Sequence, residues 1–533
     1  MSTLPEAVHT RIRSRTAALQ PEKFVERFGA LLEAHRFAVL GLLSAVYFAG
    51  AALHARAKPF WNDEIYTVLI SGLPDLHSIW RALTQGLDGH PPLGYVFVRT
   101  ARHLPLDLHI DARVPAMLGF WIFCLCLFRF VRRRMGTWPA FAALLLPFAS
   151  GTSVYSIEAR SYGQVLGFVG IALVSWQMAA DGEHRRWTLP ALALALAGAM
   201  FSHYEAGLIF GPFCGAELFR DVRRRKIDWG IWAAFFAGFL AVLSYLPFIA
   251  GQRKYMGHPW ARPHVWMLFD YYENEFRQLI IPGIAFLAFA ALYYAVYPGR
   301  GRTVEAGSAT PMDGPRSHEM VIAALFAALP FVGMAAGLLV THMFADRYVI
   351  ATTAGVVLLA VMVVARAGRN APVLPVLLVL VALGSFAQKS VPTGKFHNPI
   401  DAAPLLRKTM ALGPVAIEDG LTFFETWYYL PPQSKSRVFF PIDLDAAALY
   451  TGRDTVDRTL LAWKPWVNLP LPDYRGLEKP GRSMLVYHTS ERPFWLLGAL
   501  VHDGARVRMI AWNLTAAVYR VTFPSRPQLT TAH

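Results

Sequence analysis

The chain has 533 residues, of which 55% are hydrophobic and only 16% are charged. This composition excludes an ordinary soluble multidomain protein and is typical of a polytopic membrane protein. The formal net charge is +15, but the lysines and arginines come in short clusters between apolar runs and form no interleaved basic and aromatic face, so we expect no nucleic-acid partner.

Apolar runs long enough to cross a bilayer recur along the first three quarters of the chain. A helix of roughly 17 to 22 residues crosses about 30 Å of hydrocarbon. We therefore expect a polytopic α-helical membrane protein with about eleven transmembrane helices. Their expected positions are residues 37–53, 114–130, 138–154, 163–179, 188–201, 206–219, 229–249, 279–296, 321–340, 348–365 and 372–386.

Basic clusters lie in every second loop between these runs. Lys and Arg are retained on the cytoplasmic side, so the basic leader at residues 1–36 is expected to be cytoplasmic. With an odd number of spans, the C-terminal segment then lies outside. The sequence predicts a multi-pass membrane protein with a cytoplasmic N-terminus and an extracytoplasmic C-terminal domain.

The first outer loop, residues 54–113, carries the most informative motif. The sequence FWNDEIYT places two adjacent carboxylates, Asp63 and Glu64, just after the first span. Ionisable groups beside a bilayer are costly to desolvate, so the pair indicates a functional site. In the same loop, Asp75 is expected to cap a short interfacial helix that holds the acids at a fixed depth.

Other polar segments fall on the same outer face. They are DGHPPLGY in the first loop, YSIEARSYG after the third span, SHYEAG between the fifth and sixth spans, and DRYV before the tenth span. The loops on the cytoplasmic side are instead mostly basic and repetitive, so we expect the substrate site outside. Its candidate substrate-binding residues are His90, Glu158, Arg160, Tyr162, His203, Tyr204, Asp346, Arg347 and Tyr348.

The character of the chain changes near residue 388, where apolar runs shorten and charged residues become more frequent. Alternating apolar and polar residues at 415–419, 437–442, 483–489 and 516–523 predict strands, and the segments 423–430 and 493–503 predict helices. Residues 388–533 are therefore expected to form a small soluble extracytoplasmic α/β domain. It contains no Gly-rich phosphate loop and no nucleophile motif.

A carboxylate beside arginines, histidines and tyrosines suits a reaction in which a hydroxyl or amine loses a proton and a phosphate leaves. The carboxylate removes the proton, and the cations hold the phosphate. At an outer membrane surface, the natural phosphate-bearing donor is a polyprenyl-linked sugar, whose tail stays in lipid. The bilayer and this donor are therefore the expected partners.

The motifs WNDEIYT, GHPPLGY, YSIEARSYG, SHYEAG and DRYV, in this order, resemble those of the integral-membrane GT-C glycosyltransferases. The nearest branch is the bacterial one related to protein O-mannosyltransferases and to the aminoarabinose transferases of lipid A. The resemblance covers roughly residues 37–365 and implies a GT-C-like catalytic domain within residues 37–387, followed by the outer domain.

The resemblance also implies an activity, the inverting transfer of a sugar from a polyprenyl-phosphate donor. Asp63 would be the catalytic base, Glu64 would position the acceptor or the base, and Arg160 and Arg347 are the preferred phosphate ligands. The acceptor stays open among a lipid, a glycan and a protein.

The candidate residues also have structural alternatives. The acid pair could cap the helix that follows, Glu158 and Arg160 could close a helix end as an ion pair, and the histidine of the HPP sequence could shape a turn. His203 could bond a neighbouring backbone group. Arg347 and Tyr348 could be interfacial anchors.

Three other functions are compatible with parts of the sequence. A transporter should have internal repeats, broken helices and polar groups near the bilayer midplane. A ligase of polyprenyl-pyrophosphate oligosaccharides should be dominated by basic residues, which leaves the acid pair unexplained. In the third, the outer domain is a binding module and the membrane part is only its anchor. No cofactor is expected, and no ligand spacing supports a metal site, although the carboxylates and histidines leave a divalent cation open.

Overall fold

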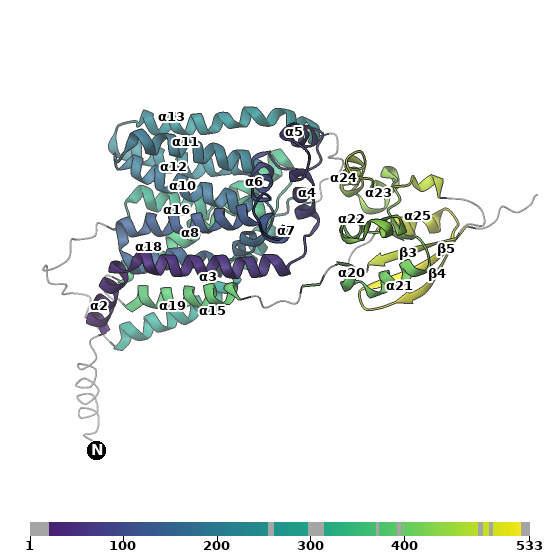
Figure 1. Cartoon of the computed structure of the whole chain (residues 1–533). Coiled ribbons are helices and arrows are strands. Elements are labelled where there is room, and N and C mark those ends of the chain that lie inside the picture. Colours follow the sequence, from purple (N-terminus) through teal and green to yellow (C-terminus); the bar gives the residue numbers. More distant parts are fainter. Residues whose placement is uncertain are drawn as a thin grey trace, which may run out of the picture.

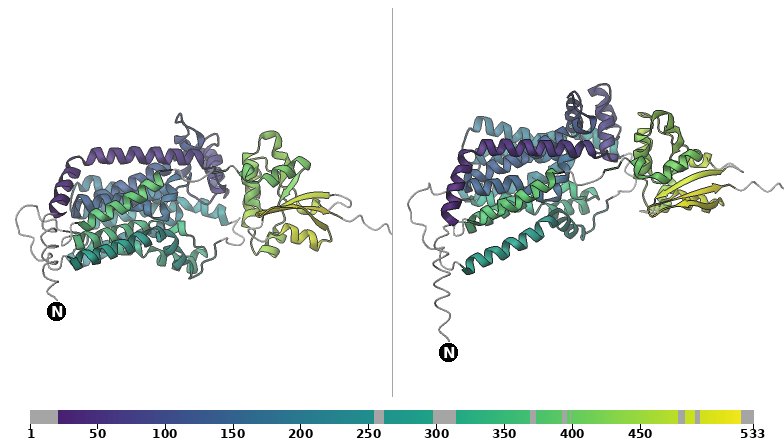
Figure 2. Two further views of the ribbon diagram at one scale, coloured as in Figure 1. Left: turned by 90° about the horizontal axis from the view of Figure 1, so that it is seen from below. Right: turned by 60° about the horizontal axis from the view of Figure 1, so that its bottom comes forward.

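The computed structural model describes residues 21–253, 261–296, 314–368, 373–391, 396–397, 399–477, 483–489 and 494–523. These residues are mostly helical. Figures 1 and 2 show a bundle of long helices with a smaller domain, which contains a sheet, at one end of it. The N-terminal helix lies at the opposite end of the bundle, and residues 1–20 of the predicted leader lie outside the described residues.

The helices of the bundle run along its length, and short 3₁₀ or π segments interrupt several of them (Figure 1). They are α2 (Pro21–Ala34), α3 (Arg36–Ala57), α8 (Val114–Met135), α9 (Thr137–Leu145), α10 (Tyr162–Ala180), α11 (Arg185–Ser202), α12 (Phe210–Arg224), α13 (Trp229–Phe239), α14 (Leu246–Arg253), α15 (Met267–Val296), α16 (Ser317–Ala327), α17 (Leu329–Ala336), α18 (Thr352–Gly368) and α19 (Val373–Ser390). The interrupting segments are η1 (Leu146–Ala149), η2 (Gly151–Ile157), η3 (Tyr204–Ile209), η4 (Leu240–Tyr245), η6 (Gly337–Thr341) and η7 (Asp346–Val349).

Each of the predicted spans falls on helix in this bundle. By length and apolar composition, five helices among the described residues can cross a membrane, or up to eight if each bent pair of helices is one span. The expected polytopic helical fold is confirmed, and the chain is a multi-pass membrane protein. The third predicted span is a broken one, because its two halves, Thr137–Ala149 and Gly151–Ile157, meet at 80°.

One span begins well before its predicted start. The range 279–296 is the second half of α15, which starts at Met267. The first half of this helix contains acidic residues, so a search for a continuous apolar segment did not include it. One of them, Glu275, is buried and accepts hydrogen bonds from the Thr152 backbone N–H at 2.7 Å and the Thr353 hydroxyl at 3.1 Å. Its polarity is thus satisfied inside the bundle.

Helices α8 and α10 approach closely at a seam of small residues. A Cβ atom added to Gly119 would clash with the backbone of Gly163, and one added to Gly163 would clash with the backbone of Ala116. Lipid tails give no hydrophobic force between helices, so such close backbone packing drives their association. The seam fixes the N-terminal end of α10, which carries part of the candidate site.

The first outer loop folds into short helices at one end of the bundle (Figure 1). They are α4 (Asn62–Ser71), α5 (Leu76–Thr84), α6 (Leu93–Ala101) and α7 (Leu108–Asp111). The predicted cap is confirmed, because the Asp75 carboxylate accepts a hydrogen bond from the Ser78 backbone N–H at 2.6 Å at the start of α5. Trp80 of α5 stays 44% exposed, as expected for an interfacial helix.

The C-terminal domain contains one five-stranded sheet in the order β2-β1-β3-β5-β4. Strand β1 pairs in parallel with β2 and β3, whereas β5 is antiparallel to β3 and β4. The elements are α20 (Pro399–Ala402), α21 (Pro404–Leu412), β1 (Val415–Ile417), α22 (Gly420–Tyr429), η8 (Pro432–Arg437), β2 (Val438–Phe439), α23 (Leu444–Thr451), α24 (Thr455–Trp463), η9 (Tyr474–Gly476), β3 (Ser483–Thr489), α25 (Leu496–His502), β4 (Arg506–Trp512) and β5 (Ala516–Thr522).

The predicted α/β class of this domain is confirmed, and the four predicted strands contain β1, β2, β3 and β5. Strand β4 was missed. It lies at the edge of the sheet and is mostly exposed, so its sequence lacks the alternation that a half-buried strand carries.

Candidate functional site

The acid pair lies in the first turn of α4. Trp61 precedes the helix in an extended conformation, and its backbone N–H donates to the Glu64 carboxylate at 3.4 Å, so Glu64 does help to cap this helix. Two carboxylates in a first turn also complement the positive end of the helix dipole. Local sequence therefore explains why the helix begins here, but the two acids have different surroundings.

Glu64 is fully buried in an ion pair with Arg113, which immediately precedes α8. The Arg113 Nε and Nη2 atoms donate to its two carboxylate oxygens at 2.7 Å and 2.8 Å, and neither side chain has any exposure. The backbone N–H of Ala159 donates to the same carboxylate at 2.7 Å. Glu64 thus ties α4 to two other segments, which suits a positioning role.

Asp63 keeps 21% of its side chain exposed, and its Oδ2 atom lies 3.8 Å from the Nη2 atom of Arg347. Arg347 is 25% exposed and comes from the η7 turn, far away in the chain. The structure therefore brings together the acid and one of the two arginines that the sequence singled out. The other one, Arg160, donates to the backbone carbonyl of Asp63 at 2.9 Å.

Arg160 is buried in a cluster with Asp88 and His90. Its Nη1 atom lies 2.5 Å from the Asp88 carboxylate, and its Nη2 atom contacts the His90 ring. Burial opposes ionisation of Asp88, but Arg160 and His90 outweigh it and hold the pKa of Asp88 well below its usual value. The pKa of His90 is lowered by burial and by Arg160, against the effect of Asp88. Arg160 is thus occupied by protein partners.

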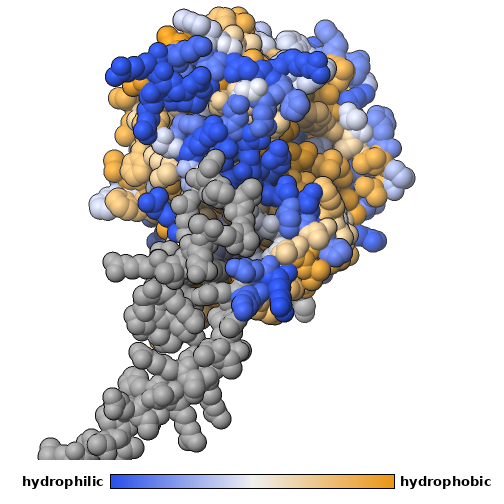
Figure 3. All heavy atoms as spheres, turned by 90° about the vertical axis from the view of Figure 1, so that its left-hand side faces the viewer, coloured by the Kyte–Doolittle hydropathy of each residue, from blue (hydrophilic) through white to orange (hydrophobic). Residues whose placement is uncertain are grey.

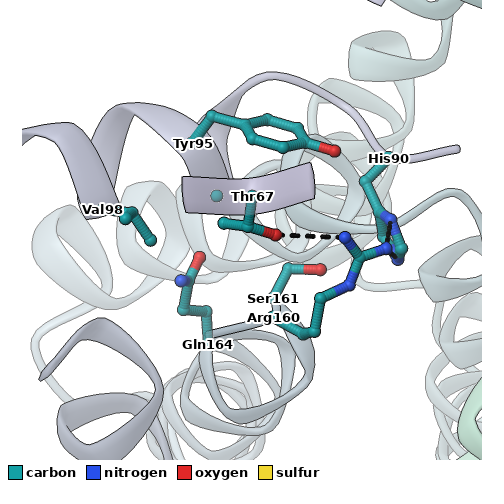
Figure 4. Close-up of a pocket in the computed structure, with 8 residues that line it drawn as sticks. Thr67, His90, Tyr95, Val98, Arg160, Ser161 and Gln164 are labelled. Atoms are coloured by element: carbon teal, nitrogen blue, oxygen red, sulfur yellow. Dashed lines mark hydrogen bonds between the residues drawn. The ribbon is translucent and has the colours of Figure 1, made fainter. Parts of the chain in front are cut away.

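A cavity of about 10 Å³, with room for about one water molecule, lies between α4, α6 and the start of α10. Figure 4 shows Thr67 at its centre, accepting a hydrogen bond of 3.0 Å from Arg160. Ser161 Oγ and Gln164 Oε1 line it and have no hydrogen-bond partner among the described residues. A water molecule would satisfy them, whereas a sugar would not fit.

Four aromatic side chains form a cluster that includes His90, the partner of Arg160. The rings of His90 and His203 lie 4.6 Å apart, Tyr162 lies 5.4 Å from His203, and Tyr348 lies 5.8 Å from His203. His203 Nδ1 accepts a hydrogen bond from the Glu205 backbone N–H at 3.1 Å, as the structural alternative expected. Four of the predicted substrate-binding residues are therefore gathered in one cluster.

The remaining predicted residues lie at its margins. Glu158 pairs with Lys58 at 3.2 Å instead of with Arg160, and its Oε2 atom is buried without a partner among the described residues. Burial raises the pKa of Glu158, against the effect of Lys58. Tyr204 packs its ring against Tyr245 at 4.9 Å, and Asp346 is exposed.

The C-terminal domain contacts the site directly through α22. The Glu425 carboxylate accepts hydrogen bonds from the backbone N–H and the side-chain amide of Asn62, at 3.0 Å and 2.7 Å. The Tyr429 hydroxyl lies 2.5 Å from the Phe60 backbone N–H. Burial, together with Asp419 and Asp63, raises the pKa of Glu425 to about 7 even though the bonds from Asn62 oppose this shift.

Sequence reasoning missed Arg113, Asp88, Asn62 and Glu425. Asp88 stands in the DGHPPLGY motif, two residues before the predicted His90, and could have been found as the acid of that motif. Arg113 and Glu425 lie outside the motifs, and Asn62, although it stands in WNDEIYT, gives no hint of a partner 363 residues away. Within the described residues, no group of three or more His, Cys, Asp or Glu side chains is arranged to hold a metal ion.

The bundle, with short outer helices after its first span, has the fold of the GT-C membrane glycosyltransferases. Among solved structures, the chain is similar to ArnT from Cupriavidus metallidurans, a lipid A aminoarabinose transferase, in the apo state. That match has 12% identity and a TM-score of 0.53, and covers 92% of this chain and 98% of ArnT.

A second structure of that ArnT, bound to undecaprenyl phosphate, matches with 14% identity and a TM-score of 0.52, and covers 91% of this chain and 98% of the other. At such identities the likeness shows the fold, and the fold expected from the motifs is confirmed. No protein-family model matches the chain. No curated protein matches it significantly either.

Proposed function

We propose that this protein is an inverting glycosyltransferase that moves one sugar from a polyprenyl phosphate to an acceptor at the outer face of a bacterial inner membrane. The observation that carries this proposal is the pairing of a partly exposed acid with a partly exposed arginine, Asp63 with Arg347 at 3.8 Å. The GT-C fold supports it, as does the undecaprenyl phosphate bound to ArnT in one of the similar structures.

The reaction assigns one role to each of these side chains. The Asp63 carboxylate accepts the proton of the acceptor hydroxyl or amine while the acceptor atom attacks C1 of the donor sugar. The bond between C1 and the phosphate oxygen breaks, and its electron pair stays on the phosphate. The configuration at C1 inverts because attack and departure occur on opposite faces. Arg347 stabilises the charge that develops on the departing phosphate.

Arg347 is a better phosphate ligand than Arg160, which the sequence also favoured. Arg160 is buried, and its terminal nitrogens contact Asp88, His90, Thr67 and the backbone of Asp63. A bound phosphate would have to break these contacts. Arg160 is therefore assigned to hold α4, and with it Asp63, in place, while Arg347 meets the donor.

The orientation rests on the basic residues at the end of the bundle opposite Asp63. There Arg133 and Arg134 of α8 pair with Asp181, which follows α10, and Arg185 of α11 pairs with Asp228, which precedes α13. Arginines are retained on the cytoplasmic side. The acid pair and the C-terminal domain then lie outside, where lipid-linked sugars are used as donors.

The test is sugar release by the purified full-length chain in nanodiscs, from a panel of radiolabelled polyprenyl-phosphate sugars with lipid, glycan and peptide acceptors. We expect Asp63→Asn to lower transfer by about 10²–10⁴-fold, the range for loss of a general base, with donor binding retained. Asp75→Asn is the matched control, since Asn caps a helix as well as Asp does. It should retain activity.

Equal activity of Asp63→Asn and the wild type would overturn the assignment of the base. If the wild type neither binds nor cleaves any polyprenyl-phosphate sugar, the transferase proposal itself fails. Cleavage of pyrophosphate-linked oligosaccharides instead would make the protein a ligase.

A further inference from the structure

A second polar cavity lies at the opposite end of the bundle, far from Asp63. Its volume is about 500 Å³, and the C-terminal end of α12 and the start of α16 provide most of its lining. Figure 3 looks onto this end and shows hydrophilic side chains spread across it, with hydrophobic ones at its flanks. The residues that matter here are Arg220, Arg223, Arg224, Arg316, Ser317 and His318.

The lining carries four arginines and one carboxylate, that of Asp181. Asp181 is already shared, because it also pairs with Arg133 and Arg134 of α8. Arg223 contacts the Ser317 hydroxyl at 3.2 Å and has no carboxylate within ion-pair distance among the described residues. Within the described chain, Arg223 is therefore left without a counter-charge, whereas Arg224 shares Asp228 with Arg220.

Two of the polar side chains that line the cavity are buried. Arg220 is 3% exposed and His318 is 9% exposed. The Nε and Nη2 atoms of Arg220 bond Glu217 and Asp228, but its Nη1 atom has no partner in the described chain. The Nε2 atom of His318 is likewise buried and unpartnered there. Arg220 Nη1 is always a donor, and His318 Nε2 is one in the tautomer that carries its proton there. Buried donors normally have partners, so these two atoms indicate a ligand with acceptor oxygens.

The depth of the cavity matches that of lipid headgroups. Trp187 near the start of α11 and Trp229 at the start of α13 are 65% and 73% exposed at the same end of the bundle. Exposed tryptophans mark the interface between hydrocarbon and water. On α12 itself, Leu218 and Val222 are 57% and 67% exposed just before the arginines, as expected for a surface that meets acyl chains.

We propose that this cavity binds a phosphate group at the cytoplasmic face, held by Arg223, Arg224 and Arg316 over the buried Arg220 and His318. Guanidinium forks match phosphate oxygens in geometry and charge. Two sources can supply the phosphate, an anionic phospholipid headgroup or free phosphate. Basic pockets between membrane helices are typical headgroup sites. This site is separate from the proposed donor site, and it links α12 to α16.

The experiment measures thermal unfolding of the detergent-purified full-length chain against increasing ligand. The three probes are dioctanoyl phosphatidylglycerol, inorganic phosphate, and dioctanoylglycerol, which lacks phosphate. The cavity variants are Arg223→Gln/Arg224→Gln and Ser317→Glu. The second places a negative charge in the cavity, at a helix N-terminus that tolerates one. The matched control, Arg27→Gln/Arg186→Gln, removes two exposed arginines outside the cavity.

We expect phosphatidylglycerol to raise Tm saturably and dioctanoylglycerol to leave it unchanged. The half-saturating concentration should rise at least fivefold in both cavity variants and change less than twofold in the control. An equal, variant-sensitive effect of inorganic phosphate supports the site and assigns it to free phosphate. Stabilisation by dioctanoylglycerol equal to that by phosphatidylglycerol, or equal responses of all variants, overturns the proposal.

Discussion

The carboxylate of Glu64 and the guanidinium of Arg113 form a two-pronged ion pair, with nitrogen–oxygen distances of 2.7 Å and 2.8 Å and no exposure of either side chain. Asp63, the preceding residue, points elsewhere and keeps 21% exposure. Consecutive positions on a helix differ by about 100° in direction, so one turn of α4 can bury one acid and present the other.

The buried pair predicts a large loss of stability in Glu64→Gln. Removing one partner leaves the other charge buried and uncompensated, which costs about 3–5 kcal/mol. Asp63→Asn removes a partly exposed charge 3.8 Å from its partner, which should cost under about 1 kcal/mol. Thermal unfolding of both variants in one detergent measures the difference. Equal Tm values would mean that Glu64 does not hold the loop together.

Replacing Arg347 should weaken donor binding, whereas replacing Arg160 should lower the stability of the protein. Arg347→Gln is expected to raise the KM for the donor at least tenfold, worth about 1.4 kcal/mol, with little change in Tm because Arg347 is partly exposed. Arg160→Gln leaves Asp88 buried without its cation, so Tm should fall by several degrees. The readouts are donor titration and thermal unfolding. A normal KM in Arg347→Gln would remove it as the phosphate ligand.

His203 should make the protein less stable in acid. Burial, then His90, Arg160 and Arg347, hold its pKa well below the usual value, so the folded state stays neutral while the unfolded chain takes up a proton below about pH 6.5. Stability therefore falls as pH drops from about 6.5, by up to about 1.4 kcal/mol per pH unit for one proton.

In His203→Asn, whose amide oxygen can replace Nδ1 as the acceptor, the fall in Tm between pH 7.5 and pH 5.5 should be smaller than in the wild type. His90 destabilises in acid in the same sense in both proteins, so His203→Asn should reduce the acid loss and leave part of it. Parallel Tm curves would show that His203 titrates in the folded protein as it does in the unfolded chain.

Glu425 should affect the pH dependence of stability in the opposite direction to His203. Burial raises its pKa to about 7, so the folded state holds its proton more tightly than the unfolded chain. Its contribution is fully present below about pH 4.5 and is lost as pH rises through about 7. Glu425→Gln keeps a neutral acceptor for Asn62. Its Tm should match that of the wild type at pH 5 and exceed it at pH 8.

The control for this prediction is Asp445→Asn, which changes an acid that is 95% exposed in the same domain and should give a Tm difference independent of pH. A constant offset between Glu425→Gln and the wild type would contradict the raised pKa.

Much of the fold was predictable because its signals are local. A helix that crosses lipid must be long and apolar, so composition placed each predicted span on helix, although five helices, or up to eight, among the described residues can cross a membrane by length and composition. Helix α15 was predicted only in part, because Glu275 and its acidic neighbours are typical of an exposed segment. Only the structure shows that Thr152 and Thr353 bond Glu275 inside the bundle. Strand alternation predicted most of the C-terminal sheet for the same local reason, and failed at the exposed edge strand β4.

The sequence by itself determined that a membrane protein carries an acid pair, histidines and arginines at one end of its bundle. Only the tertiary structure decided which acid is buried, that Arg160 bonds Asp88, and that a residue 363 positions away, Glu425, bonds Asn62 beside the acids. The reason is physical: the state of a charged group depends on its burial and on the charges within a few ångströms, and both are set by segments that meet only after folding.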